Sequence, residues 1–195
     1  MIFRVTIILV LLGFSLNTHS QNADINLLKS INNNRNISLD NPFKLTSMSV
    51  YPISAAVPIG FLSIGLIKKD SAFLHKGINA GIALATDVII TTTLKYIINR
   101  KRPYDKYGFI QPVGKENTPS FPSGHSGAAF ATATTISLYY PKWYVIIPAY
   151  SWAGLVAYSR MHLGVHYPSD VLIGAVVGSL SSYLSYKAYC YVIKK

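Results

Sequence analysis

Cysteine and charge are both scarce in this chain of 195 residues. The single cysteine, Cys190, excludes an intrachain disulfide framework and a zinc site built on cysteines. Charged residues make up only 13% of the chain, against roughly 25% in an ordinary soluble domain. Acidic residues are the scarcest, because 7 Asp and Glu face 18 Lys and Arg, and the formal net charge is +11. The sequence also has no internal repeat and no long stretch in which apolar and polar residues alternate as in a β-strand. It therefore predicts an all-α protein.

Hydrophobic residues account for 50% of the chain. This proportion is too high for a basic nucleic-acid-binding module, so no nucleic-acid partner is expected. The anionic partners that remain for so basic a chain are a membrane surface and a phosphorylated substrate. The composition therefore indicates a protein of the lipid bilayer.

Residues 1–20 have the pattern of a signal peptide. Arg4 supplies a positive charge, VTIILVLLGF supplies about ten apolar residues, and NTHSQ follows with small and polar residues. The apolar stretch is too short for a comfortable membrane span. We expect cleavage near Ser20, which would place residue 21 outside the cytoplasm, with a retained anchor as the alternative.

The rest of the chain divides into an arm and a membrane domain. Residues 21–45 are rich in asparagine and predict an extracytoplasmic arm, either exposed or folded as a short surface helix. Residues 46–195 predict the membrane domain, which begins with a stretch of 22 uncharged residues, 46–67. Further apolar segments are 77–94, 125–140, 143–159 and 171–193. We expect a polytopic helical bundle of about five spans, and the shorter segments leave a soluble all-helical protein as an alternative.

Three polar clusters interrupt these segments. The first, KYIINRKRP, begins with Lys95 at a helix end, and Arg102 follows seven residues later, on the same side if the helix continues. Lysine acts on a phosphate as a point charge, whereas arginine offers a planar fork for two oxygens. The cluster therefore predicts a phosphate site or a basic juxtamembrane patch that holds anionic lipid.

The second and third clusters each lie at an expected helix start. In FPSGHSG, Ser123, Gly124 and the first helical N–H groups make a seat for an anion with His125 beside it, or simply a turn that begins a helix. In SRMHLGVHYPSDV, Asp170 lies four residues after His166. Its carboxylate can accept a hydrogen bond from one imidazole nitrogen and leave the other as a base or nucleophile, or it complements the helix dipole.

The expected topology brings the three clusters to the outer membrane surface. The outer loop after Lys95 breaks the positive-inside rule with its basic residues, and phosphate binding would explain this. The pattern Lys-x6-Arg-Pro, Pro-Ser-Gly-His and Ser-Arg-x5-His-x3-Asp resembles the signature of the phosphatidic acid phosphatase type 2 superfamily. That superfamily includes membrane lipid phosphatases, bacterial acid phosphatases and vanadium haloperoxidases. The resemblance covers residues 77–185, and the signature itself covers 95–170.

The resemblance implies a phosphatase that needs no metal or other cofactor and forms a phosphohistidine. His166 would attack phosphorus, Asp170 would orient its ring, and His125 would protonate the leaving oxygen and then activate water. The residues that would hold the phosphoryl oxygens are Lys95, Arg102, Ser123, Gly124 and Arg160. Such a division suits phosphoryl transfer, which depends mainly on positioning and charge stabilisation.

A site at the bilayer face implies a lipid substrate with a phosphate or diphosphate head. Phosphatidate, phosphatidylglycerol phosphate, undecaprenyl diphosphate and lipid A phosphates all fit. We expect an integral inner-membrane protein with its site on the extracytoplasmic, periplasmic face. The alternatives are a secreted acid phosphatase acting on soluble phosphomonoesters and a non-catalytic membrane protein that binds anionic lipid.

Two residues outside the signature are further candidates. His162 stands four residues before His166, and such a pair binds zinc when both lie on one helix, but Pro168 argues against a helix through His166. Asp87 lies within an apolar segment, where an ionisable group is a candidate for function. We expect it either to serve the substrate or to pair with basic loop residues.

Overall fold

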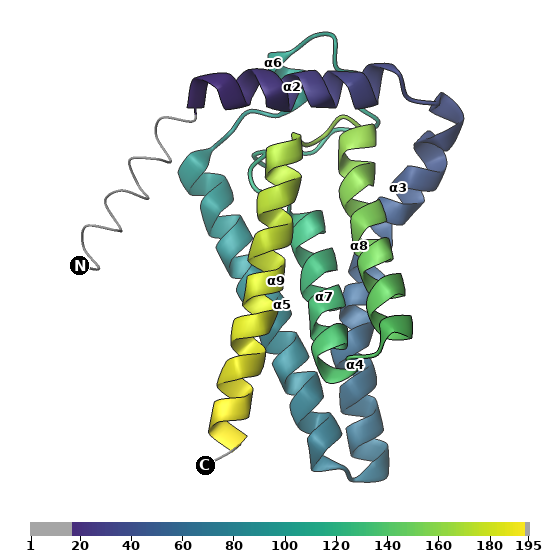
Figure 1. Cartoon of the computed structure of the whole chain (residues 1–195), viewed down its shortest axis with the longest axis vertical. Helices are drawn as coiled ribbons and strands as arrows, with labels where there is room; N and C mark the ends of the chain where they lie inside the picture. The colour runs from purple at the N-terminus through teal and green to yellow at the C-terminus, as the bar shows by residue number, and fades with distance from the viewer. Residues whose placement is uncertain (1–16, 194–195) are drawn as a thin grey trace, which may run out of the picture.

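A bundle of long helices makes up the protein, as the computed structural model in Figure 1 shows for residues 17–193. These described residues contain helices and no strand, so the predicted all-α fold is confirmed. The long helices are α4 (Val50–Lys68), α5 (Ser71–Ile98), α7 (Gly124–Tyr139), α8 (Trp143–His162) and α9 (Pro168–Ile193). Most of the predicted signal peptide lies outside the described residues, and its cleavage stays a prediction.

Helix α7 is central to the bundle and contacts α4, α5, α8 and α9. Small residues make this possible, since Ala and Thr fill its buried face. Gly174 and Gly178 of α9 bring the two backbones together: a Cβ on Gly178 would lie 2.0 Å from the carbonyl oxygen of Gly127, and one on Gly174 2.3 Å from that of Ser123. Such small-residue spacing is typical of helices packed within membranes.

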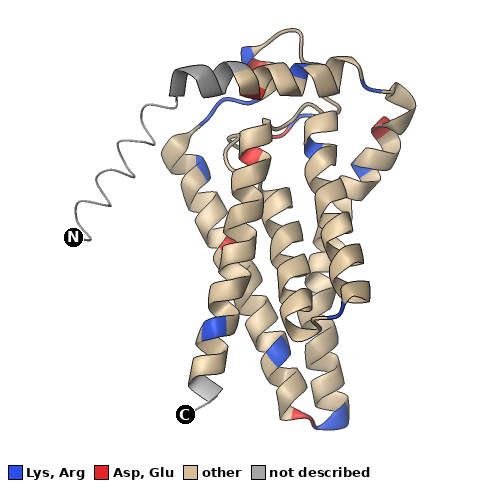
Figure 2. Cartoon of the chain, viewed as in Figure 1, with Lys and Arg blue, Asp and Glu red and all other residues tan. Residues whose placement is uncertain are grey.

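Three stretches of helix are long and apolar enough to cross a membrane: Ile37–Lys68, Ser71–Lys106 and Pro168–Tyr191. Large hydrophobic side chains are exposed along them, among them Ile67, Ile89 and Leu172. Figure 2 shows that the charged residues gather mainly toward the two ends of the bundle. This distribution is that of a protein surrounded by lipid. The prediction of about five spans stays a prediction for the other two long helices.

The N-terminal arm forms α2 (Asn17–Asn33), the short 3-10 helix η1 (Ile37–Leu39) and α3 (Asp40–Met48). Helix α2 lies across one end of the bundle (Figure 1) and begins before the predicted cleavage position, Ser20. The arm is helical, as in the second of its two expected forms, but its inner face is not exposed, because Ile25 and Leu28 are buried in a cluster with Ile110 and Tyr167. The arm is therefore part of the packed structure at this end.

The loop 99–123 covers the same end and includes the single turn α6 (Pro103–Lys106). Helix α5 ends at Ile98, since Asn99 adopts a left-handed conformation with φ 47° and closes the helix through its N–H to Lys95 O. Arg102 consequently lies in extended backbone at the start of α6. The expectation that a continued helix carries Lys95 and Arg102 is wrong, and the loop brings them together instead.

Candidate active site

All three polar clusters meet at the end of the bundle under α2. Helix α5 and the following loop carry the first cluster, the start of α7 carries the second, and the α8–α9 turn carries the third. They surround a cavity of about 470 Å³ whose lining includes Lys95, Arg102, Glu116, Thr118, His125 and His166. The predicted residues Ser123, Arg160 and Asp170 are buried beside it. The sequence-predicted site residues are thus brought to one place.

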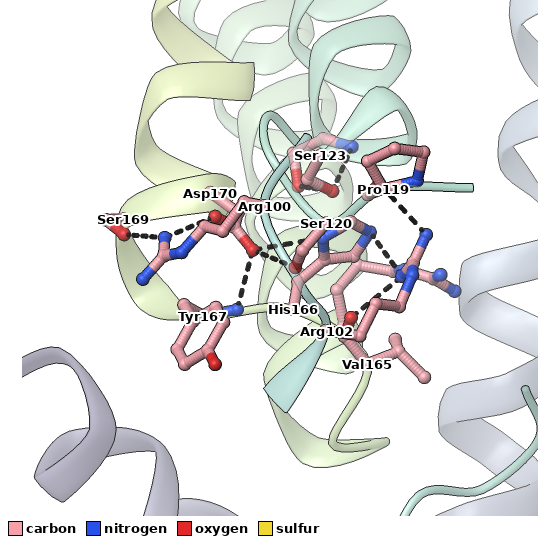
Figure 3. Close-up of polar contacts among 12 residues, drawn as sticks. Arg100, Arg102, Pro119, Ser120, Ser123, Val165, His166, Tyr167, Ser169 and Asp170 are labelled. Atoms are coloured by element: carbon pink, nitrogen blue, oxygen red, sulfur yellow. Dashed lines mark hydrogen bonds and ion pairs between the residues drawn. The ribbon is translucent and has the colours of Figure 1, made fainter. Parts of the chain in front are cut away.

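His166 and Asp170 form a buried pair between α8 and α9. His166 Nδ1 lies 3.4 Å from Asp170 Oδ2, and Arg102 Nη1 lies 3.3 Å from His166 Nε2 (Figure 3). Arginine can only donate, so Nε2 is the accepting nitrogen and Nδ1 carries the proton toward the carboxylate. Burial lowers the pKa of His166 to about 4, helped by the charges of Arg160 and Arg102 and opposed by the hydrogen bond to Asp170. At neutral pH the ring is therefore uncharged, with a lone pair on Nε2.

The carboxylate of Asp170 is held on both of its oxygens. Oδ2 accepts a hydrogen bond from the Tyr167 backbone N–H at 3.0 Å and another from the Ser120 hydroxyl. Oδ1 accepts from Arg100 Nη1 at 2.6 Å. Because Pro168 begins α9, Asp170 lies in the first turn, where the helix dipole also favours a negative charge. The carboxylate thus has one orientation available, with Oδ2 toward His166.

The cations of the first cluster are fixed by backbone carbonyl groups. Lys95 Nζ donates to Pro119 O at 2.6 Å. Arg102 is almost wholly buried and donates through Nε to Thr118 O and through Nη1 to Val165 O, both at 2.8 Å. Carbonyl oxygens orient these side chains without neutralising them. Their positive charge remains available to an anion in the cavity.

The start of α7 is formed as predicted. Ser123 caps the helix, and its hydroxyl oxygen accepts from the N–H of Ser126 at 3.4 Å and from the Ser126 hydroxyl at 3.0 Å. Gly124 is the first helical residue, and both Gly124 and His125 line the cavity. The ring of His125 meets the Tyr51 ring edge-on, with 5.1 Å between centroids. This places an imidazole beside a helix N-terminus, in the lining of the cavity that also contains His166.

Glu116 is a site residue that the sequence analysis missed. Its carboxylate forms an ion pair with Arg160 and approaches Arg102 Nη2 to 3.6 Å. Burial works to raise the pKa of Glu116, but the charges of Arg160 and Arg102 prevail and lower it to about 2. An anion therefore already lies among the predicted phosphate-binding cations. The sequence did offer one sign of it, because Glu116 is the single glutamate of the chain and lies within a basic loop.

Arg100 and Ser120, both in contact with Asp170, were also missed as site residues.

His162 and Asp87 do not join the site. Helix α8 ends at His162, whose Nε2 lies 2.9 Å from Asp40 Oδ1, so it shares no helix with His166. In the described part of the chain, no group of three or more His, Cys, Asp or Glu residues is placed to hold a metal ion.

Asp87 is buried where α5 packs against Gly127 of α7. Neither of its carboxylate oxygens has a hydrogen-bond partner among the described residues. The expected pairing with basic loop residues is therefore wrong, since the carboxylate lies inside the helix interface.

Comparison with known proteins places this architecture in a family. The model of the PAP2 superfamily matches residues 76–194. An undecaprenyl-diphosphatase of Sulfolobus acidocaldarius is 35% identical over 113 residues, which are 56% of this chain and 53% of that protein. A lipid A 1-phosphatase of Rhizobium johnstonii is 34% identical over 103 residues, 50% of this chain and 41% of that protein. The chain therefore spans about half the length of the curated relatives it matches.

Two solved structures share the fold over a greater length. LpxE of Aquifex aeolicus has a TM-score of 0.73 at 25% identity, covering 85% of this chain and 95% of that one. A transmembrane PAP2-type phosphatidylglycerolphosphate phosphatase of Bacillus subtilis has a TM-score of 0.75 at 26% identity, covering 99% and 97%. The apolar helices and these membrane relatives show an integral membrane protein. By the family match and the arrangement of its three clusters, the chain belongs to the PAP2 superfamily.

Proposed function

We propose that this protein is a phosphatase that hydrolyses a phosphate or diphosphate ester of a membrane lipid. The observation that carries the proposal is the two-sided lining of the 470 Å³ cavity. Its polar end holds two histidines and two cations, whereas its wall on α4 and α5 is largely apolar, with Val50, Tyr51, Ala55, Leu84 and Val88. A lipid phosphate has the same two parts, an anionic head and a hydrocarbon tail.

The neutral ring of His166 is suited to nucleophilic attack. Its Nε2 lone pair would form a bond to phosphorus while the ester P–O bond breaks, and the Nδ1 proton would remain hydrogen-bonded to Asp170. His125, which must be protonated when the substrate is bound, would give that proton to the leaving lipid oxygen. Water would then attack the phosphohistidine, passing a proton back to His125 and releasing inorganic phosphate and the free His166. The two steps restore both histidines to their starting forms.

Charge stabilisation in this scheme comes from side chains of the chain itself. Lys95, Arg102 and Arg160 would surround the equatorial oxygens, and the N–H groups at Gly124 would face the same anion. Phosphoryl transfer draws most of its rate from such positioning and electrostatics. The proposal therefore requires no metal or other cofactor, and an effect of metal removal would count against it.

The relatives support a lipid substrate, since their names specify undecaprenyl diphosphate, lipid A and phosphatidylglycerolphosphate. These compounds share a phosphate or diphosphate on an apolar anchor, which is the chemistry that we propose for this site. We further propose that the protein lies in the inner membrane with the site on the extracytoplasmic face. Lys68 and Lys69, where α4 ends, lie at the end of the bundle away from α2 (Figure 1) and support this orientation.

Purified protein in detergent, given a panel of lipid phosphates and diphosphates, tests the proposal by release of inorganic phosphate. We expect turnover of at least one lipid and its loss in His166→Ala. Hydrolysis of soluble phosphomonoesters alone would favour the acid phosphatase alternative. Lipid binding without any phosphate release would favour a non-catalytic lipid-binding protein.

A further inference from the structure

Arg100 lies on the side of Asp170 that faces away from the cavity. Its Nη1 donates to Asp170 Oδ1 at 2.6 Å and to the Ser169 hydroxyl at 2.7 Å. Its Nη2 donates to Asp24 Oδ2 at 2.7 Å. One guanidinium group thus joins two carboxylates, one in α9 and the other in α2 (Figure 3 shows the Asp170 side).

The arrangement around Arg100 is rigid. Its guanidinium carbon lies 3.8 Å from the centroid of the Tyr167 ring, which restricts the group to one plane. Asp24 also accepts from the Ser169 backbone N–H at 2.8 Å and from the Ser169 hydroxyl at 2.5 Å. The Asp24 carboxylate is nearly buried and that of Asp170 is fully buried. Partly desolvated, charge-assisted bonds of this kind are stronger than those between exposed groups.

Arg100 controls the second oxygen of Asp170 as well. Its carbonyl oxygen accepts from the N–H of Ser120 at 2.8 Å, and the Ser120 hydroxyl in turn donates to Asp170 Oδ2. The Arg100 side chain therefore acts on Oδ1, whereas the link to Oδ2 through Ser120 is made by the backbone carbonyl, which any residue at position 100 would supply. Because Oδ2 is the oxygen that faces His166 Nδ1, the orientation of the His166 ring depends on this residue.

Arg100 is absent from the lining of the cavity that holds His125 and His166, and it lines a separate surface pocket of about 240 Å³. Among the residues predicted for the site, its side chain forms a hydrogen bond with Asp170. Asp24 is one step further away and belongs to α2, outside the residues 76–194 that the family model matches. Neither residue was assigned a role by the three-part signature.

We propose that Asp24 and Arg100 are positioning residues, and that α2 locks the His166–Asp170 pair through the chain of contacts Asp24–Arg100–Asp170–His166. Two observations carry this inference: the guanidinium shared by two carboxylates, and the buried seating of α2 on Ile110 and Tyr167. The inference rests on the proposed phosphatase activity. It adds that this activity depends on the N-terminal helix α2.

The kinetic test compares Arg100→Gln and Asp24→Asn with wild type on the best lipid substrate. Misorientation of the attacking ring lowers kcat, so Arg100→Gln should lose about 10- to 100-fold in kcat and Asp24→Asn a smaller factor. KM should stay within about 2-fold, because Lys95 and Arg102 are untouched. The double variant should be no worse than Arg100→Gln alone, since Asp24 acts through Arg100.

Asp40→Asn is the matched control. Asp40 is also a partly buried carboxylate of the N-terminal arm, paired with Arg35 and His162, but it has no contact with Asp170. It should change kcat by less than about 2-fold even if it lowers stability. If Arg100→Gln does not fold, Arg100→Lys replaces it and should give an intermediate kcat, because a single ammonium cannot serve both carboxylates.

A second readout needs no substrate. In protein labelled with ¹⁵N-histidine, the His166 signal, identified by its loss in His166→Gln, should show one Nδ1–H tautomer in wild type and Asp40→Asn and a mixture in Arg100→Gln. An unchanged tautomer, or an unchanged kcat in an active enzyme, overturns the positioning role. Wild-type protein without phosphatase activity overturns the proposed function, and the tautomer measurement then decides the positioning role alone.

Discussion

Glu116, in the lining of the cavity, forms an ion pair with Arg160. Arg160 is one of the cations that we propose to bind a phosphoryl oxygen. A carboxylate and a substrate phosphate cannot both occupy this cation without repulsion. We therefore expect the charge of Glu116 to oppose phosphate binding and to lower the affinity of the site for an anion.

Glu116→Gln should bind anions more tightly than wild type. Removing the negative charge frees Arg160 and Arg102, and we expect about tenfold tighter inhibition by vanadate, or about 1.4 kcal/mol. Asp105→Asn is the control, because Asp105 is an exposed acid of the same loop with no ion pair among the described residues. Weaker vanadate binding in Glu116→Gln would show that the carboxylate assists the anion rather than competing with it.

The acid limb of the pH profile of kcat/KM should follow the protonation of His166, whereas loss of the proton from His125, the proposed general acid, lowers activity at higher pH. The pKa of His166 lies at about 4, below its ordinary value because of burial. The neutral, nucleophilic ring therefore predominates above that pH, and activity falls as pH decreases through 4 because the ring takes up a proton. Glu116 keeps its charge over this range, since its pKa is about 2. The profile is corrected for the separately measured ionisation of the substrate, and a fall centred near pH 6.5 would contradict an unprotonated buried ring.

Inhibitors distinguish the proposed chemistry from metal-dependent hydrolysis. Vanadate resembles the five-coordinate phosphoryl transition state and should inhibit, whereas EDTA should leave activity within about 2-fold of the untreated enzyme. Phosphate release is measured after dialysis against the chelator, with and without added zinc. If EDTA abolishes activity and added zinc restores it, His162 and the other histidines become candidate zinc ligands again.

Gly174→Ala should destabilise the protein and the site together. A Cβ there would lie 2.3 Å from Ser123 O, so α9 must move away from α7 at an expected cost of about 2 kcal/mol. Gly154→Ala in α8 is the matched control, because no atom lies within 4 Å of its added Cβ. Thermal unfolding in detergent compares the two, and equal midpoints would contradict the close packing of α7 on α9.

The positions of site residues at helix starts could be predicted from the sequence, because neighbouring residues mark where each helix begins. Ser123, Gly124 and Asp170 each lie at a helix start marked by Pro or Gly, and local backbone geometry alone determines where such side chains point. His166 could be linked to Asp170 for the same reason, since the two are close in sequence. These assignments needed only short-range rules.

Contacts made by the loop 99–123 could not be predicted in this way. Glu116 meets Arg160, and Arg100 meets Asp24, across 44 and 76 residues of sequence, and no periodic pattern records such pairs. The continued helix assumed for Lys95 and Arg102 was wrong because Asn99 ends α5, yet the two side chains still converge on Thr118 and Pro119. Tertiary folding of an irregular loop decides these positions.

Because Asp24 in α2 contacts Ser169 in α9, the first described helix and the first turn of the last helix meet beside the candidate nucleophile. Asp24 lies 145 residues before Ser169, so this side of the site is assembled from segments that are far apart in the sequence. A chain that ends before α9 would lack Asp170 and Ser169, and both the contact of His166 with its carboxylate partner and the contact of α2 with α9 would be lost.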